Sequence, residues 1–295
     1  MNDLPAAAAY PRWRSFLYII ATYAVASAAA WFAFDMVPAT WPLASLTGFF
    51  ASTLVTIVAS LLVRNGSVFD PWWSVLPPVA AFWLAHTATE LHPRAALVLP
   101  VVGLWALRLT LNWARGWPGL HHEDWRYAKL YRDWPLPWWL TLVLGVELFP
   151  MLIVWLGCLP LGTALSAATR PLRSLDALAL VIGLAATAIE FVADEQMRRF
   201  TRQRQPGEIM QSGLWRYSRH PNYFGEILFW VSLWLFAVSA DPAVWWTGIG
   251  GLAIVLMFVF ASIPMLDERS RERRPGFEAY ARRTSALVPR PPRRD

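Results

Sequence analysis

Cysteine and charged residues are scarce in this chain of 295 residues. Cys158 is the single cysteine, so no disulfide can form within the chain, and its apolar surroundings argue against thiolate chemistry. Charged residues make up 16% of the chain, hydrophobic residues make up 56%, and the mean hydropathy is +0.37. This composition excludes an ordinary soluble domain and is typical of a membrane protein.

Several familiar ligand-binding and catalytic motifs are also missing. The chain has no G-x-G-x-x-G after a strand, no G-x-x-x-x-G-K-[ST] and no G-x-S-x-G. A dinucleotide would therefore have to bind among helices. His121 and His122 precede two acidic residues, but adjacent histidines on a helix point apart, so we expect no metal site.

Long apolar runs indicate an all-α fold, a polytopic bundle of membrane helices. The first run has no small-residue cleavage site of the kind that ends a signal peptide, so we expect it to remain as a helix. About eight runs approach the roughly 20 residues that a bilayer requires. The predicted spans are 15–34, 43–63, 72–91, 95–113, 138–164, 175–197, 224–239 and 244–266.

Basic residues are distributed unevenly between the two predicted sides of the membrane. With the N-terminus inside, 22 of the 26 Lys and Arg residues fall in cytoplasmic segments and three fall outside. This asymmetry predicts an even number of spans with both termini in the cytoplasm. The net charge of +6 then reflects membrane orientation and anionic ligands, and we expect no nucleic-acid partner.

The stretch 214–226 is dense in hydrogen-bonding side chains, yet it leads directly into an apolar helix. Its cationic side chains could hold phosphates, Asn222 offers an amide, and Tyr223 could stack or donate a hydrogen bond. The positive-inside rule is a competing explanation for any single arginine. The candidates for a ligand with several phosphates are Arg198, Arg199, Arg202, Arg204, Arg216, Arg219 and His220, with Tyr217 in the same stretch.

Other charges lie within or beside the predicted helices. Arg108 lies inside a span, where a charge usually faces a cavity or a partner. Glu190 and Asp194 are one turn apart on one helix face, which suggests either ribose binding or pairing with arginines. Glu147 must face the bundle interior. Asp70, which precedes a proline, could cap the next helix or could act on a substrate.

Residues Ser218-Arg219-His220-Pro221-Asn222-Tyr223-Phe224-Gly225-Glu226 carry a family resemblance. They resemble the C-terminal motif of membrane steroid 5-alpha-reductases, sterol C14/delta-7 reductases and isoprenylcysteine or phospholipid methyltransferases. Segments 65–74, 113–127 and 267–280 look more narrowly like an uncharacterised bacterial family with a steroid 5-alpha-reductase-like C-terminal domain. The resemblance implies a seven-helix reductase-like core over 43–288, an extra N-terminal helix within 1–42, a disordered basic tail at 289–295 and a bacterial inner-membrane location.

The resemblance implies an integral membrane oxidoreductase that uses NADPH to reduce a conjugated C=C bond in a steroid-like or other lipid. Asp70 and Trp105 fall where steroid reductases polarise the substrate ketone, but Trp105 cannot donate a phenolic proton, so Tyr127 or Tyr223 could be the acid. Residues that would line the cofactor on this basis are Arg108, Arg115, Glu190, Asp194, Asn222 and Glu226.

Two other classes of function stay open at this point. An S-adenosylmethionine-dependent methyltransferase of membrane lipids or prenylcysteine shares the R-H-P-x-Y-x-G-E core, but its cofactor carries no phosphate for the many arginines. A membrane scaffold or transporter is the non-enzymatic alternative. Against it, the polar residues gather on one predicted face, and few lie along a path through the bilayer.

Overall fold

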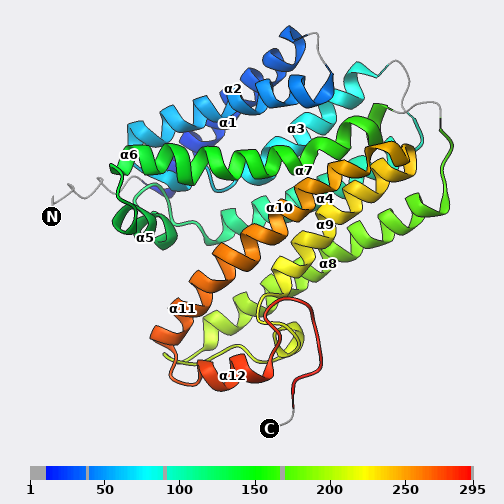
Figure 1. Cartoon of the computed structure of the whole chain (residues 1–295). Coiled ribbons are helices and arrows are strands. Elements are labelled where there is room, and N and C mark those ends of the chain that lie inside the picture. Colours follow the sequence, from blue (N-terminus) through cyan, green and yellow to red (C-terminus); the bar gives the residue numbers. More distant parts are fainter. Residues whose placement is uncertain (1–10, 38–39, 89–91, 167–169, 294–295) are drawn as a thin grey trace.

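A computed structural model describes residues 11–37, 40–88, 92–166 and 170–293 of the chain (Figure 1). Within these ranges the fold is helical, and the only β-type pairing is an isolated bridge between Ser218 and Ser285. The all-α prediction is confirmed. The helices are α1 (Arg12–Met36), α2 (Trp41–Val63), α3 (Trp72–Thr87), α4 (Ala95–Gly116), α5 (Trp125–Asp133), α6 (Trp138–Thr141), α7 (Phe149–Ser166), α8 (Ser174–Gln203), α9 (Pro221–Ala240), α10 (Ile249–Met257), α11 (Ile263–Arg273) and α12 (Phe277–Arg283).

Seven helices in the described part of the chain are long and apolar enough to cross a bilayer. The remaining predicted span corresponds to α3, which has 16 residues and a Pro77-Pro78 pair inside it. At 1.5 Å per residue it reaches about 24 Å, less than the bilayer core of about 30 Å. Residues 89–91, where we predicted this span to end, lie outside the described ranges. Two of the seven combine several segments: α6 continues into α7 through the π-helical residues Leu142–Leu148, and η4 (Pro242–Gly248), α10 and α11 are continuous through the π-helical residues Phe258–Ser262. The seven candidates are Arg12–Met36, Trp41–Val63, Ala95–Gly116, Trp138–Ser166, Ser174–Gln203, Pro221–Ala240 and Pro242–Arg273.

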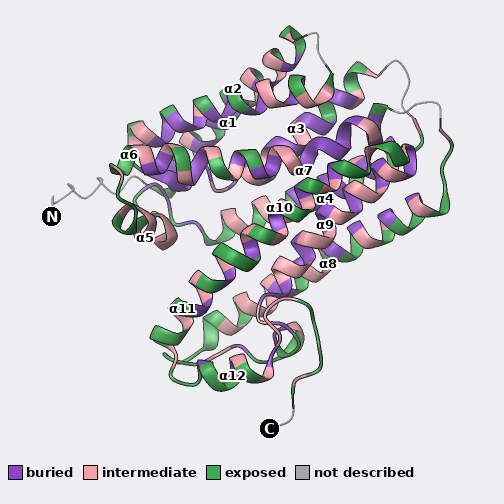
Figure 2. Ribbon diagram, in the orientation of Figure 1, coloured by how far each residue is buried: buried purple, intermediate pink, exposed green. Residues whose placement is uncertain are grey.

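Large apolar side chains lie both inside the bundle and on its outer surface. Trp72, Trp105 and Trp230 are almost fully buried, whereas Leu62 and Phe260 are more than two-thirds exposed. Figure 2 shows exposed residues along the outer sides of the long helices and buried residues between them. Exposed apolar side chains on spans of this length fit lipid contact. The fold is therefore that of a polytopic membrane bundle.

Helices α4 and α8 run parallel and in register, since two ion pairs join them with equal spacing along both helices. Arg94 binds Asp176 where the two helices begin, and Arg108 binds Glu190 near the middle of α8. Two glycines allow α8 to approach its neighbours closely. A Cβ at Gly183 would lie 2.6 Å from Val101 of α4, and one at Gly225 of α9 would lie 2.9 Å from the Ala186 carbonyl of α8. This close packing places polar side chains of α4, α8 and α9 together.

Helix α1 packs into the bundle as an integral element. Its Tyr23 hydroxyl donates to the Val68 carbonyl at 2.6 Å, and Ser15 accepts from the Leu120 amide at 3.1 Å. At the other end of the chain, the segment predicted to be a disordered tail is described as far as residue 293. There the Arg290 amide donates to the Tyr217 carbonyl at 3.0 Å. Residues 294–295 lie outside the described ranges.

Candidate functional site

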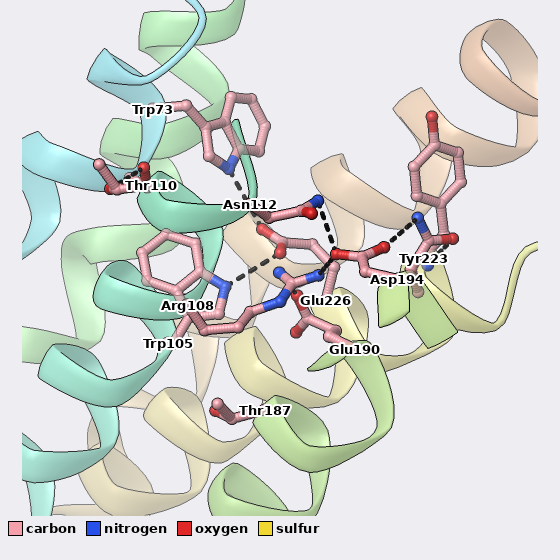
Figure 3. A network of polar contacts seen from close by, with 12 residues as sticks. Trp73, Trp105, Arg108, Thr110, Asn112, Thr187, Glu190, Asp194, Tyr223 and Glu226 are labelled. Carbon is pink, nitrogen blue, oxygen red and sulfur yellow. Dashed lines mark hydrogen bonds and ion pairs between the residues drawn. The ribbon is translucent and has the colours of Figure 1, made fainter. Parts of the chain in front are cut away.

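Arg108 of α4 is the centre of a buried ionic network (Figure 3). One guanidinium nitrogen forms a short contact with Glu190 and the other donates to Asp194 at 2.5 Å, both carboxylates being on α8. The Arg108 and Glu190 side chains are 8% and 1% exposed. Of the two alternatives left open for Glu190 and Asp194, the structure shows pairing with arginine, because α4 places Arg108 opposite that face of α8.

Asp194 joins residues from three helices. Its Oδ2 also accepts from the Asn112 side chain of α4 at 2.8 Å, and its Oδ1 accepts from the Asn222 side chain of α9 at 3.4 Å. The Asn112 carbonyl in turn accepts from Arg198 at 2.6 Å. The contacts form a continuous chain from Arg108, deep between the helices, to Arg198 near the end of α8. Asn112 was missed as a site residue, although it lies one turn beyond Arg108.

Glu226 of α9 accepts hydrogen bonds from three tryptophans. Trp73 donates to Oε1 at 3.1 Å and Trp105 donates to Oε2 at 2.9 Å (Figure 3). Trp230 also donates to Oε1, at 2.9 Å. Trp105 is fully buried, and its ring stacks on Phe229 at a centroid distance of 4.1 Å. The single N–H of Trp105 is therefore occupied by Glu226, which leaves no donor for a substrate carbonyl. Trp230, one turn beyond Glu226, was missed.

Three polar atoms in the network have no hydrogen-bond partner within the described residues. They are Glu190 Oε1, Arg108 Nε and Arg198 Nε, all buried. An unpaired buried donor or acceptor is costly, and such atoms mark places where a ligand or water completes the bonding. Unpaired hydrogen-bonding groups that a ligand could use therefore lie between α4 and α8.

Two cavities adjoin this network and share Leu111, Arg115, Glu195 and Arg198. The larger, of about 820 Å³, also has Arg12 and Arg202 in its lining, so it is lined by four arginines and one carboxylate. The smaller, of about 380 Å³, lies between α4 and α8, with Arg108, Asn112 and Asp194 beside apolar side chains. The charge balance of the larger cavity favours an anionic ligand.

Asp70 and Tyr127 form a second polar cluster outside the membrane-spanning helices. The Tyr127 hydroxyl makes a short hydrogen bond to Asp70, which provides no side-chain cap for α3. Burial raises the pKa of Asp70 to about 6, against the opposing effects of Arg126 and the Tyr127 hydroxyl. Burial and the Asp70 charge raise the pKa of Tyr127 as well. At neutral pH the tyrosine thus retains its proton beside the aspartate.

The loop around Asp70 is held by residues of the segment that leads into α5. Asp124 caps α5 by accepting from the Arg126 amide at 2.8 Å, and its own amide donates to Ser67 at 2.9 Å. The guanidinium of Arg126 lowers the pKa of Asp124 despite the desolvation of that carboxyl. Glu123 accepts from the Gly66 amide at 2.7 Å. These contacts give the two acidic residues that follow His122 a structural role.

The side chains of Arg219 and His220 both contact other residues of the protein. Arg219 donates to Asp267 at 2.6 Å and to the Thr284 carbonyl at 2.7 Å, and His220 Nε2 lies 3.2 Å from the same aspartate. Ser218 donates to the Leu287 carbonyl at 2.7 Å. The predicted phosphate-binding role of Arg219 and His220 does not fit these contacts, because the pair fastens the start of α9 to α11 and the C-terminal segment.

The other predicted site residues are distributed over several places. Arg115 lines both cavities of the network, whereas Arg204 is exposed just beyond the end of α8. Arg216, whose guanidinium lies 6.0 Å from the Tyr217 ring centroid, lines a different hollow of about 450 Å³. Tyr223 stacks on Phe258 at a centroid distance of 4.2 Å. The stretch 214–226 is therefore not a single pocket.

The fold and the site define a helical membrane protein with a buried polar network between parallel spans. Residues 56–284 match the family described as "Protein of unknown function (DUF1295)", and the chain belongs to that family, which is related to steroid 5-alpha-reductase-like proteins. An uncharacterised protein of the fission yeast Schizosaccharomyces pombe is 25% identical over 259 residues, covering 78% of this chain and 74% of the yeast protein. No solved structure matches the chain significantly.

Proposed function

We propose that this protein is an NADPH-dependent membrane reductase that acts on a conjugated C=C bond in a lipid. One observation carries the proposal. The hydrogen-bonded chain Arg108–Asp194–Asn112–Arg198 leads from an incompletely paired, buried site to an arginine-lined cavity. A dinucleotide phosphate needs both features, an enclosed polar end and a cationic end.

The residues present suit such a cofactor. Within the described ranges neither Arg115 nor Arg202 makes a side-chain hydrogen bond or ion pair, so their donors are available for phosphates. Asn222 and the unpaired Glu190 Oε1 offer an amide and a carboxylate at the enclosed end. Glu226, whose oxygens serve three indoles, would instead support the site by holding Trp73, Trp105 and Trp230. When bound, NADPH supplies a hydride.

The Tyr127–Asp70 pair is our candidate for the proton that completes the reduction. Its short hydrogen bond holds the phenolic proton, and Arg126 is close enough to interact electrostatically with both Tyr127 and Tyr223 of α9. Tyr127 can donate its proton as the substrate carbonyl gains negative charge. Trp105 cannot take this role because its N–H is bound to Glu226.

The cavity between α4 and α8 favours a lipid substrate. Its apolar lining includes Leu104, Leu107 and Phe191, each of which is also substantially exposed on the outer surface of the bundle. A cavity with apolar walls on a membrane-spanning surface is accessible to a ligand dissolved in the bilayer. Arg108 and Asp194 also line this cavity, so a lipid bound there would lie next to the enclosed end of the proposed cofactor site.

Cofactor binding by the purified protein tests the proposal first. NADPH, NADH and S-adenosylmethionine would be compared by calorimetry for the wild type and Asn222→Ala. Gln211→Ala, which removes an exposed amide that lines neither cavity of the network, is the matched control. We expect NADPH to bind, Asn222→Ala to weaken it, and Gln211→Ala to leave it unchanged. Binding of S-adenosylmethionine alone would support methyl transfer and contradict the proposal.

Turnover tests the reaction itself. NADPH oxidation would be followed with a panel of lipid enones and with matched saturated ketones. We expect oxidation only with the enones, and a loss of about a hundredfold or more in Tyr127→Phe, which removes the acid, in line with the usual size of general-acid effects. Equal rates for wild type and Tyr127→Phe would exclude this tyrosine as the proton donor.

A further inference from the structure

Helix α1 begins outside the segment shared with the family but lines the larger cavity of the site. The family match starts at residue 56, whereas Arg12, Trp13 and Phe16 are among the lining residues. The remaining lining residues come from α4 and α8, between Leu111 and Arg202. The N-terminal helix thus adds a cation and two aromatic rings to a cavity whose other cations belong to the shared segment.

Arg12 is held in place by the end of α4. Its Nε donates to the Trp117 carbonyl at 2.9 Å, and its Nη2 donates to the Ala114 carbonyl at 2.7 Å and to the Arg115 carbonyl at 3.4 Å. These contacts satisfy terminal carbonyls of a helix and interact favourably with its dipole. They leave Nη1 available, so Arg12 can reach a ligand without losing its anchor.

The cavity has an excess of positive charge. Among the described residues Glu195 is the one carboxylate in its lining, and it forms ion pairs with Arg198 at 3.7 Å and with Arg199 at 3.1 Å. Arg198 Nε is buried and has no hydrogen-bond partner within the described ranges. Grouped guanidinium groups repel one another, and the repulsion is relieved when an anion binds among them. Phosphate, with several acceptor oxygens, suits four guanidinium groups.

The aromatic residues of α1 distinguish a nucleotide from a simple anion. Phe16 packs edge-on against Trp113 and Trp117, with centroid distances of 5.9 and 5.3 Å, and so forms a fixed wall. Trp13 is 58% exposed, and Arg14 lies 5.1 Å from its ring centroid. An exposed indole beside arginines offers a surface on which a nucleobase can stack. Anchoring at the membrane interface is the other use of such a tryptophan.

We propose that α1 completes an adenine-nucleotide site, in which the base stacks on Trp13 and Arg12 binds a phosphate together with Arg115, Arg198 and Arg202. The inference rests on the proposed function and deepens it, since it assigns the adenosine end of the cofactor to the cavity lined by α1. It also makes the extra N-terminal helix a part of the binding site.

Fragments of the nucleotide provide the test. ADP and adenosine 2′,5′-bisphosphate would be titrated into the full-length protein in detergent, alongside NADPH, for the wild type, Arg12→Gln and Trp13→Ala. Arg64→Gln removes a positive charge at the end of α2 that does not line the cavity, and Trp245→Ala removes an exposed tryptophan on η4 (Pro242–Gly248), outside the cavity. A parallel titration would use short-chain phosphatidylglycerol and phosphatidylcholine.

We expect both fragments to bind, and Arg12→Gln and Trp13→Ala each to weaken them about tenfold, in line with one charge-assisted contact or one stacked base. The two control variants should bind like the wild type, and thermal unfolding should show that all four variants are folded.

Fragment binding without NADPH turnover would leave this inference standing and contradict the reductase. Unchanged NADPH and fragment affinities in Arg12→Gln and Trp13→Ala would overturn the inference alone. Binding of phosphatidylglycerol but not of the nucleotides would overturn it in favour of a lipid headgroup.

Discussion

Helices α4 and α8 carry two arginine–carboxylate clusters. The clusters differ in the number of carboxylates that face the arginine and in how far their side chains are exposed. Arg94 faces one carboxylate, Asp176, at 2.7 Å, and the two side chains are 0% and 1% exposed. Arg108 faces two carboxylates, and the side chain of Asp194 is 14% exposed. The same two helices in the same register thus form a sealed pair where they begin and an open network further along.

The difference shows that a buried ion pair is not by itself a sign of function. Arg94–Asp176 joins the beginnings of the two helices, with Arg94 also donating to the Pro171 carbonyl at 3.2 Å. The Arg108 network has a surplus carboxylate and two adjoining cavities. A buried guanidinium nitrogen without a hydrogen-bond partner in the described residues occurs in both clusters and does not distinguish them. We therefore expect substitutions in the first cluster to reduce stability and substitutions in the second to reduce ligand binding.

The largest effect should come from breaking the sealed pair. Arg94→Leu leaves Asp176 charged and buried without its partner, which should cost about 3–5 kcal/mol of unfolding free energy. Thermal unfolding in detergent would measure the loss. The double variant Arg94→Leu/Asp176→Leu should recover most of it, because an apolar pair leaves no unpaired charge. A loss below about 1 kcal/mol in the single variant would mean that water reaches this site.

In the open network, Asp194→Asn should weaken NADPH binding about tenfold, which corresponds to about 1.4 kcal/mol, with a smaller change in stability. The substitution removes the charge that holds Arg108, Asn112 and Asn222 in their relative positions. Calorimetry would measure the affinity. Glu195→Gln is the matched control, since it removes a neighbouring carboxylate that lines the cavity, and it should bind phosphates equally well or more tightly. Equal weakening in both variants would contradict a specific role for Asp194.

A smaller effect is expected from Trp105→Phe. The substitution removes the hydrogen bond to Glu226 but preserves a ring that can stack on Phe229. The free energy of unfolding should fall by about 0.5–1.5 kcal/mol, the usual net contribution of one hydrogen bond, because Glu226 keeps its bonds from two other tryptophans. Turnover should fall far less than in Tyr127→Phe. A turnover loss as large as that of Tyr127→Phe would mean that Trp105 takes a direct part in catalysis.

The last prediction concerns the pH dependence of stability contributed by Asp70. Its pKa is raised from 3.8 to about 6 in the fold, so the folded protein binds a proton more readily than the unfolded chain. Asp70 therefore stabilises the protein at low pH, and this contribution is lost as the pH rises through about 6. Tm measured from about pH 4 to about pH 7 should decrease more steeply for the wild type than for Asp70→Asn. Parallel profiles would contradict the raised pKa.

Much of the candidate site was visible in the sequence because charges are rare in apolar helices. Arg108, Glu190 and Asp194 were selected on that ground, and the structure places them in contact. Asn222 also joins the network. Asn112, Trp73 and Trp230 were not selected, because an amide or an indole in a membrane helix has many ordinary explanations. Their partners on other helices identify them only in the folded chain.

Hydropathy by itself determined the helical membrane fold and the approximate helix bounds, because the preference for lipid is a local property summed along each segment. Contacts between distant residues were decided by tertiary structure alone. Asp70 meets Tyr127 across 57 residues, and Arg219 meets Asp267 across 48. Such contacts depend on the rotation and axial register of packed helices, which many sequences with the same hydropathy could set differently. That packing separates the stretch 214–226 into structural and ligand-facing residues.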